Sequence, residues 1–157
     1  MSDDILDFGH PEVFHVMPNR QYVVGSLDVK TFGSTDQGVS FLIGVEGKKI
    51  FHAGDLNWWH WVNDSQDKQL EEETAFKGIV QALPGEHVDV AFIPCDLRLG
   101  DAKTWAIDYF ASAKSVSYVV PIHFRTHFEV SAELIKHFHG SGKAVRVTKC
   151  DEVVLNL

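Results

Sequence analysis

Cysteine is scarce in this sequence: it has only two, Cys95 and Cys150, and their spacing is not that of a metal-ligand pair. Such sparing use of cysteine is typical of a reducing compartment, so we expect a cytoplasmic protein. Apolar runs of about 18 residues, the length that spans a bilayer, are absent. Met1 is followed by Ser-Asp-Asp rather than by a basic and then an apolar stretch. We therefore expect neither a secretion signal nor a membrane partner.

Positive charge is also in short supply, because 22 acidic residues face 14 basic ones and the formal net charge is −8. This balance disfavours nucleic acid and anionic membranes as partners and leaves a small-molecule substrate open. No Gly-rich phosphate loop and no Gly-x-Ser-x-Gly motif is present. Histidine, in contrast, is frequent, with nine in 157 residues, which directs attention to metal binding.

The length and the 45% hydrophobic content predict one globular domain over residues 1–157. In the first third, alternating and apolar runs predict a β-meander with strands at 13–17, 22–24, 27–32, 39–45 and 49–52. Further along, helical spacing predicts three helices: one after the cap Asp64-Ser65, one around 106–113, and one around 134–138 that ends at Gly140. Apolar runs at 88–93 and 116–122 predict strands between them, and short strands follow at 145–147 and 153–155. The fold class is therefore α/β.

Three of the predicted strands end in polar residues, namely Asp55, Asp96 and His123. If these ends lie on one edge of the sheet, the three side chains converge, and His with Asp suits a divalent ion such as zinc, manganese or iron. Structural roles remain open for each of them. Asp55 could cap a turn, Asp96 could pair with Arg98, and His123 could be a hydrogen-bonded core histidine.

The segment after Asp55 places three tryptophans within four residues, Trp58, Trp59 and Trp61, around His60. These bulky amphipathic rings are suited to form a wall beside the carboxylate, and His60 is a candidate for substrate contact. An aromatic plug in the core is the alternative. Cys95 follows Pro94 at a strand end; a small buried hydrophobic residue is a simpler interpretation than a nucleophile.

Several segments of the sequence resemble a bacterial branch of the metallo-β-lactamase-fold hydrolases. They are residues 33–43, residues 50–61 with His-Ala-Gly-Asp, residues 89–94 followed by Asp96 and Arg98, and Pro121-Ile122-His123-Phe124. The resemblance runs from the first residues to about His123 and is most specific around His-Ala-Gly-Asp.

This resemblance implies a fold of two β-sheets between helices and a metal-dependent hydrolase, in which metal-activated water attacks an ester, amide, lactone or phosphodiester bond. Asp55 and His123 would then be both metal ligands and catalytic residues, with zinc or manganese as the cofactor. The expected substrate-binding residues are Trp58, Trp59, His60 and Arg98. Behind the ligands, His52, Asn57 and Asp96 are expected to support them.

The sequence departs from the family in one respect: the His-x-His-x-Asp-His signature, which supplies most of the ligands, is absent. The chain resembles the C-terminal half of the family's domain with some middle strands, and Met1 falls inside the usual domain. A catalytic zinc normally has three protein ligands. We therefore expect a homo-oligomer or a missing N-terminal half to complete the site, and weak or absent hydrolysis by the chain alone. The alternative is a non-catalytic remnant that binds a small molecule or dimerises.

Overall fold

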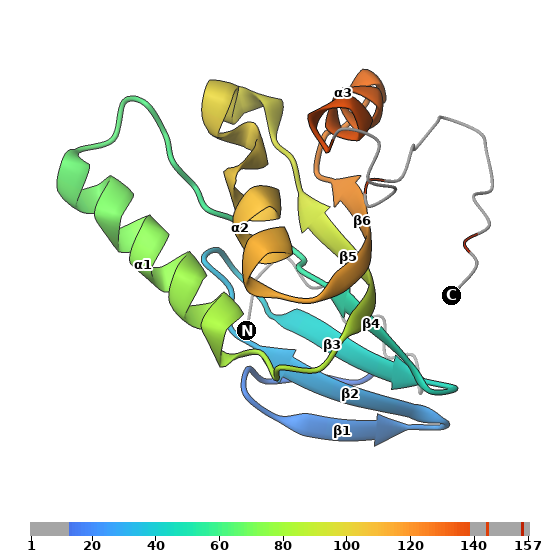
Figure 1. Ribbon diagram of the computed structural model, residues 1–157. Coiled ribbons are helices and arrows are strands. Elements are labelled where there is room, and N and C mark those ends of the chain that lie inside the picture. Colours follow the sequence, from blue (N-terminus) through green and yellow to red (C-terminus); the bar gives the residue numbers. More distant parts are fainter. Residues whose placement is uncertain (1–12, 139–143, 145–154, 156–157) are drawn as a thin grey trace.

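The computed structural model describes residues 13–138, 144 and 155, and these form one mixed sheet with helices packed on it (Figure 1). The six strands lie side by side in chain order: β1 Gln21–Val24, β2 Leu27–Phe32, β3 Ser40–Val45, β4 Lys48–His52, β5 Val88–Pro94 and β6 Val116–Ile122. The pairs from β1 to β4 are antiparallel, whereas β4, β5 and β6 run parallel to one another. The predicted meander followed by alternating helices and strands is confirmed.

Tight turns with left-handed backbone set the register of the meander. Gly25 (φ 60°) lies in the turn between β1 and β2, where Val24 pairs with Leu27. In the next hairpin Glu46 (φ 48°) and Gly47 (φ 79°) both have positive φ, as a two-residue type I′ turn requires. The sequence pattern therefore fixes both the turns and which residues pair across them.

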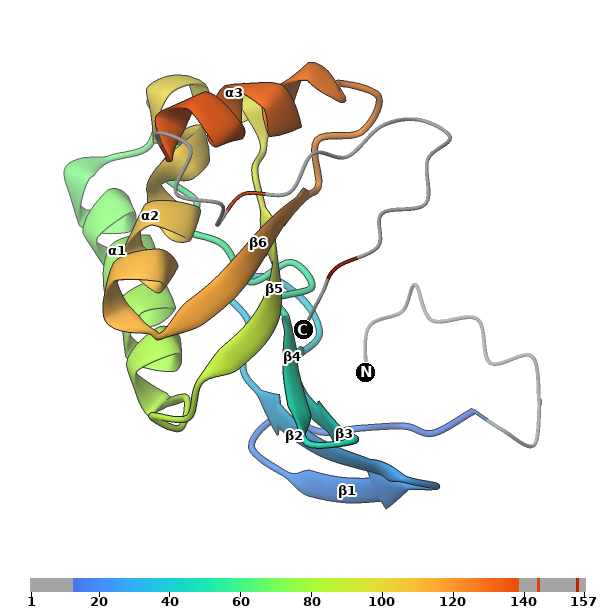
Figure 2. The same ribbon diagram turned by 45° about the vertical axis from the view of Figure 1, so that its right-hand side comes forward.

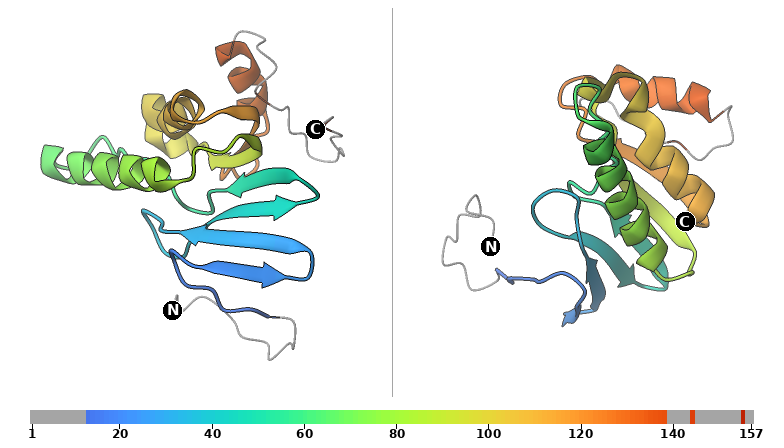
Figure 3. Two further views of the ribbon diagram at one scale, coloured as in Figure 1. Left: turned by 60° about the horizontal axis from the view of Figure 1, so that its bottom comes forward. Right: turned by 90° about the vertical axis from the view of Figure 1, so that its left-hand side faces the viewer.

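Four described helical segments accompany the sheet. They are α1 Gln66–Ala82, the 3₁₀ segment η1 Leu97–Thr104, α2 Trp105–Ala113 and α3 Glu129–His137. Figures 2 and 3 show α1 and α2 on the same side of the sheet, while α3 lies beyond the upper end of β6. The helix α1 begins after Ser65, whose hydroxyl accepts a hydrogen bond from the backbone N–H of Lys68.

The core lies between this helix layer and the sheet. Phe51 of β4 is 1% exposed and stacks on Phe110 of α2, with 4.9 Å between the ring centroids. Phe76 and Val80 are the buried residues of α1. The strand β5 is buried at Val88, Val90, Ala91 and Ile93, as expected for a central parallel strand. The apolar spacing of the sequence therefore identified the residues that hold the helices on the sheet.

Some sequence-based expectations are wrong or fall outside the described residues. Residues 13–17 form no strand: the backbone N–H of Met17 donates to the Tyr22 hydroxyl, and its carbonyl accepts from the Thr31 hydroxyl. Side chains thus form the hydrogen bonds with Met17 that the backbone of a neighbouring strand would otherwise form. The helix around 134–138 ends at His137, whereas Gly140 and the strands at 145–147 and 153–154 lie outside the described residues; Leu155 itself is in no strand. Among the described helices, none combines the length and apolarity needed to cross a membrane.

Candidate functional site

The sheet brings Asp55 and His123 together at one edge. Asp55 follows β4 and His123 follows β6, and because β4, β5 and β6 are parallel, their carboxyl ends lie at the same edge. His123 Nε2 lies 3.7 Å from Asp55 Oδ1, within the roughly 3–5 Å expected of two groups that share a metal ion. The strands themselves are not adjacent, because β5 runs between them.

The backbone at His123 has φ 65°, a left-handed conformation that is uncommon for a residue with a side chain. Strain of this kind costs about 1–3 kcal/mol and concentrates at functional sites. Arg125, two residues on, has φ 55°, so the left-handed backbone belongs to the turn that leads out of β6. This turn sets the direction of the His123 side chain.

Asp96 connects His123 to Arg98. Its carboxylate is 3% exposed, and Oδ2 lies 3.0 Å from His123 Nδ1, although the direction of the ring N–H falls outside hydrogen-bond geometry. Arg98 donates to the same carboxylate from its backbone N–H (2.9 Å), from Nε (2.9 Å) and from Nη2 (2.5 Å). Asp96 thus pairs with Arg98 and also supports His123.

The charge state of Asp96 follows from these contacts. Burial alone raises the pKa of the carboxyl, but the hydrogen bonds and charge of Arg98, with a further contribution from His123, outweigh burial and lower it below the usual value. The group is therefore a carboxylate at neutral pH. A carboxylate close to one ring nitrogen of a histidine is a common arrangement around metal-binding histidines.

The turn that carries Asp55 depends on Gly54 and His52. Gly54 has φ 58°, and a Cβ there would lie 3.0 Å from the carbonyl oxygen of Val39. The backbone N–H of Gly54 donates to His52 Nδ1 at 3.0 Å, and the His52 ring stacks on Phe92. Burial lowers the pKa of His52, partly offset by the negative charge of Asp55. His52 thus supports the turn rather than touching His123.

The tryptophans divide between the site and the helix layer. Trp59 presents its ring edge-on to His123, with centroids 5.5 Å apart, and its indole N–H donates to the Asp55 carbonyl at 3.3 Å. Trp58 packs instead against Phe76 of α1 and lies beneath the Lys77 ammonium, which is 4.4 Å from its ring centroid. Trp59 therefore lies beside both candidate ligands, whereas Trp58 lies against α1; the substrate-binding roles expected of both stay predictions.

Asn57 lies inside the fold rather than at the site. It is 1% exposed; its backbone N–H donates to the Thr35 hydroxyl, which in turn donates to the Asn57 carbonyl at 2.7 Å. Its side-chain Nδ2 is buried, without a hydrogen-bond partner among the described residues. The hydrogen bonds of Asn57 thus join the loop at 33–38 to the segment after Asp55. Asn57 supports this segment and does not itself face the two candidate ligands.

A pocket of about 630 Å³ adjoins this site; we call it the aromatic pocket. His60 and Trp61 line it from one side, and Arg98, Leu99, Ala102 and Trp105 line it from η1 and the start of α2. His60 and Arg98, two of the expected substrate-binding residues, line this pocket, and their role in substrate binding stays a prediction. Trp61 and Trp105 were not expected there. The two-residue spacing of Trp59 and Trp61 is a signal that their rings lie on the same side of the chain. Nothing in the sequence indicates that Trp105 lines the same pocket as Trp61.

The candidate ligands offer a divalent metal ion two donors. Asp55 and His123 supply two donors that face one another, and both residue types suit zinc or manganese. Within the described ranges, no group of three or more His, Cys, Asp and Glu side chains is arranged to hold a metal ion. Other histidines are engaged elsewhere: His127 with Glu129, His137 with Asp108, and His87 with two serine hydroxyls. The described residues fit part of a metal site.

Searches for similar proteins found matches only among solved structures, since no family model and no curated protein matches the chain. The CmlA β-hydroxylase E377D mutant has a TM-score of 0.58 and 14% identity, over 87% of this chain and 32% of that one. A protein of the metallo-β-lactamase superfamily from Thermotoga maritima has a TM-score of 0.39 and 18% identity, over 72% of this chain and 50% of that one.

The chain therefore spans about a third to a half of the length of these proteins. The similarity to the CmlA structure concerns the fold alone. Together with the mixed sheet and its helix layer, it supports the α/β fold expected from the sequence, which resembles part of a metallo-β-lactamase sandwich.

Proposed function

We propose that this chain carries part of the active site of a metal-dependent hydrolase, with Asp55 and His123 as metal ligands and catalytic residues. The observation that carries the proposal is the 3.7 Å separation between Asp55 Oδ1 and His123 Nε2 at the carboxyl edge of the parallel strands. Two donors bound at ~2.0–2.2 Å to one ion lie at about this distance from each other.

The surrounding residues prepare both donors. The Asp96 carboxylate lies 3.0 Å from Nδ1 of His123, whereas Nε2, the other ring nitrogen, lies 3.7 Å from Asp55 Oδ1. The Asp55 side chain is 52% exposed, so a ligand can reach its carboxylate from solvent. Trp59 covers His123 from the side and limits the water around it.

Zinc or manganese is the metal that these donors suit, and when bound it would supply an activated water and positive charge for the developing oxyanion of an ester, amide, lactone or phosphodiester. A catalytic zinc needs a third protein ligand. We propose that it comes from outside the described residues, either from another segment of the polypeptide or from a second copy of the chain. The second candidate function, binding of a small molecule without catalysis, is favoured by the aromatic pocket beside the two donors.

Metal binding tests the proposal most directly. Titration calorimetry with ZnCl₂ and MnCl₂ should show binding that weakens about tenfold or more in Asp55→Ala and in His123→Ala. The control is His87→Ala, because His87 lies just before β5 and contacts Ser115 and Ser117 at the start of β6, the opposite end of these strands from the site. Zinc binding that is unchanged in both site variants would refute the proposed ligands.

Activity and assembly form the second part of the test. Light scattering should give the number of copies, and hydrolysis of 4-nitrophenyl acetate, a lactone and bis(4-nitrophenyl) phosphate should be followed with added metal. We expect weak or no turnover by the monomeric chain and more where copies associate. Strong metal-dependent turnover that survives both site substitutions would place the active site elsewhere. Tight metal binding in an associated form that hydrolyses nothing would favour the non-catalytic candidate.

A further inference from the structure

The aromatic pocket is built from two segments that are distant in the sequence. Residues 60–63 form one side, and η1 with the first turn of α2 forms the other. Its volume of about 630 Å³ falls in the range of small-molecule sites, about 300–1,000 Å³. Gly100 and Ala102, which have no bulky side chain, contribute to its lining, so the pocket is not filled by the chain itself.

The rings of the pocket are held in fixed positions. His60 lies against Trp105, with 4.6 Å between centroids, and Trp105 makes an edge-to-face contact with Trp58, with centroids 5.2 Å apart. Trp61 stacks on Trp59 with nearly parallel planes, 5.9 Å between centroids. Rings that are already immobilised lose little conformational entropy when a ligand stacks on them. The pocket is therefore preorganised for a flat ligand.

The pocket is connected to the candidate ligands by two routes. Trp59, on which Trp61 stacks, is edge-on to His123. Arg98, whose guanidinium carbon lies 5.3 Å from the Trp61 ring centroid, is held by the same Asp96 that supports His123. A molecule seated in the pocket thus lies next to the place where hydrolysis is proposed.

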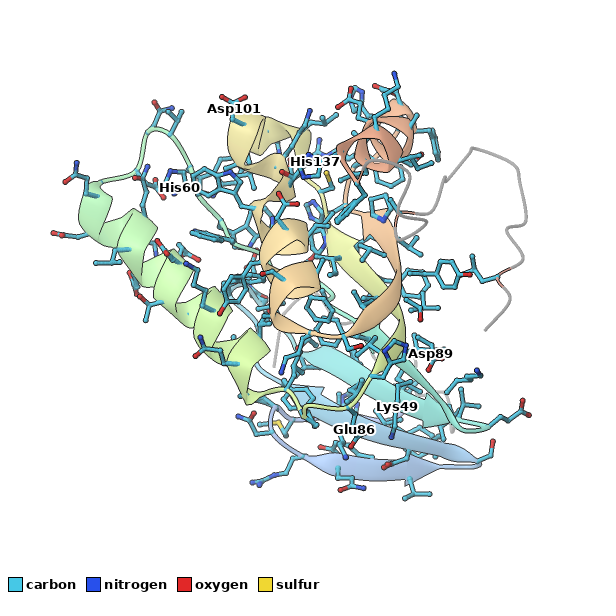
Figure 4. All side chains as sticks on the ribbon, viewed as in Figure 1. Lys49, His60, Glu86, Asp89, Asp101 and His137 are labelled. Atoms are coloured by element: carbon cyan, nitrogen blue, oxygen red, sulfur yellow. The ribbon has the colours of Figure 1, made fainter. Side chains whose placement is uncertain are left out.

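Charge decides which flat ligand fits. The Arg98 cation is matched by Asp96, while its side chain stays 48% exposed and keeps N–H groups that can donate to a ligand oxygen. Asp101, which also lines the pocket, takes part in no ion pair among the described residues. Figure 4 shows Asp101 and His60 at the same end of the molecule. The unmatched carboxylate disfavours an anion and accepts a neutral group.

We propose that the aromatic pocket binds an uncharged aromatic ring of the substrate, with a carbonyl or similar acceptor directed at Arg98. The inference rests on the proposed function only in that it calls the ligand a substrate. Ring binding itself requires neither metal nor turnover.

Binding of matched probes to the full chain tests it. Naphthalene-2-carboxamide is flat and neutral, 2-naphthoate is flat and anionic, and cyclohexanecarboxamide is neutral but not flat. In two-dimensional NMR of the ¹⁵N-labelled tryptophan side chains, the amide should shift the indole signals of Trp61 and Trp105 in a saturable way. The naphthoate should bind about fivefold or more weakly, and the saturated amide should shift neither signal. Absence of saturable shifts with the naphthalene amide, or equal shifts with the saturated one, would overturn the inference.

Variants separate the contributions. Trp105→Leu should weaken binding of the naphthalene amide about fivefold or more, whereas Val23→Ala, at an exposed position on β1, should leave it unchanged. Asp101→Asn should bring the affinity for 2-naphthoate close to that for the amide; an unchanged preference would refute the charge argument. Because the tryptophan signals of the wild-type chain already test the pocket, a Trp105→Leu variant that fails to fold does not prevent a decision.

Asp55→Ala separates this inference from the proposed function. Ring binding that persists in Asp55→Ala, in a chain that binds no zinc, would refute the metal site and keep the pocket. Zinc binding that depends on Asp55, in a chain that binds no ring, would refute the pocket and keep the metal site.

Discussion

The two ends of the sheet carry charged side chains in different ways. At one end Glu86 pairs with Lys49 at 3.1 Å and with Lys30 at 3.6 Å, and Asp89 accepts from the backbone N–H of Lys49. At the other end the Asp55 carboxylate faces a histidine and solvent. Figure 4 shows Lys49, Glu86 and Asp89 gathered near the turn between β3 and β4, far from His60, Asp101 and His137.

Strand direction explains the difference. At the first end, the start of β4 meets the start of β5, so Lys49 and the neighbouring Lys30 pair with acidic residues that are distant in the sequence. The parallel strands β4, β5 and β6 all deliver their carboxyl ends to one edge, where Asp55, Asp96 and His123 meet across more than 60 residues of sequence. The comparison teaches that a charged cluster indicates a site only where the charges remain unmatched. The predictions below test that contrast.

The largest effect is expected in the core that supports the parallel edge. Phe51→Ala should lower the free energy of unfolding by about 3–5 kcal/mol, because Phe51 is 1% exposed and stacks on Phe110. Val23→Ala, on the exposed outer strand of the meander, should change it by less than about 0.5 kcal/mol. Urea denaturation followed by circular dichroism measures both. Equal losses would mean that the meander, and not the helix-covered half, stabilises the fold.

The next effect concerns Asp96. Asp96→Asn should reduce zinc affinity about 10–100-fold, since it removes the negative charge 3.0 Å from Nδ1 of His123, while the two donors stay in place. The matched carboxylate at the other end of the sheet, Glu86→Gln, should leave zinc affinity unchanged. Calorimetric titration distinguishes them. If both substitutions act alike, the two ends do not differ in the way proposed.

The turn before Asp55 gives a smaller effect, compared with a turn of the meander. Gly54→Ala should cost about 2 kcal/mol, because φ is 58° and the added Cβ would lie 3.0 Å from the Val39 carbonyl. Gly25→Ala meets nothing within 4 Å at nearly the same φ and should cost about 1 kcal/mol. Thermal unfolding of the two variants gives the difference. A Gly54 variant as stable as the Gly25 variant would show that the site turn tolerates a shift.

Much of this arrangement could be predicted from the sequence, because periodicity and turn residues act locally. The apolar runs and the turn at Glu46-Gly47 gave the strands, and the polar residues at strand ends gave Asp55, Asp96 and His123. The strand predicted at 13–17 is absent, because an alternating sequence pattern does not show whether a neighbouring strand is available for pairing. The backbone of Met17 forms hydrogen bonds with the side chains of Tyr22 and Thr31 instead.

The aromatic pocket was harder to predict because it depends on packing between distant segments. Nothing local to Trp105 indicates that it meets His60, and nothing local to Trp58 indicates that α1 and Lys77 enclose it. The dual contact of Asp96, with Arg98 and with His123, also required the fold: two alternatives left open by the sequence turned out to hold together. The metal-binding roles of Asp55 and His123 stay predictions.

The smallest effect is a pH dependence that should come from the site turn. Burial lowers the pKa of His52 in the folded chain below its ordinary value of 6.5, so the unfolded chain binds a proton more readily. Stability from this group is therefore complete above about pH 6.5 and is lost as the pH falls through the lower folded pKa. Protonation also removes the Nδ1 lone pair that accepts from the Gly54 N–H.

His52→Gln should accordingly flatten the fall in unfolding free energy between pH 7 and pH 5, measured by urea denaturation at several pH values. Glutamine keeps an acceptor for the Gly54 N–H but does not titrate, which separates proton binding from loss of the contact. The comparison variant is His127→Gln, where the side chain is 55% exposed and pairs with Glu129 away from the turn. If His127→Gln reduces the pH dependence and His52→Gln does not, the loss of stability in acid comes from the start of α3 and not from the turn before Asp55.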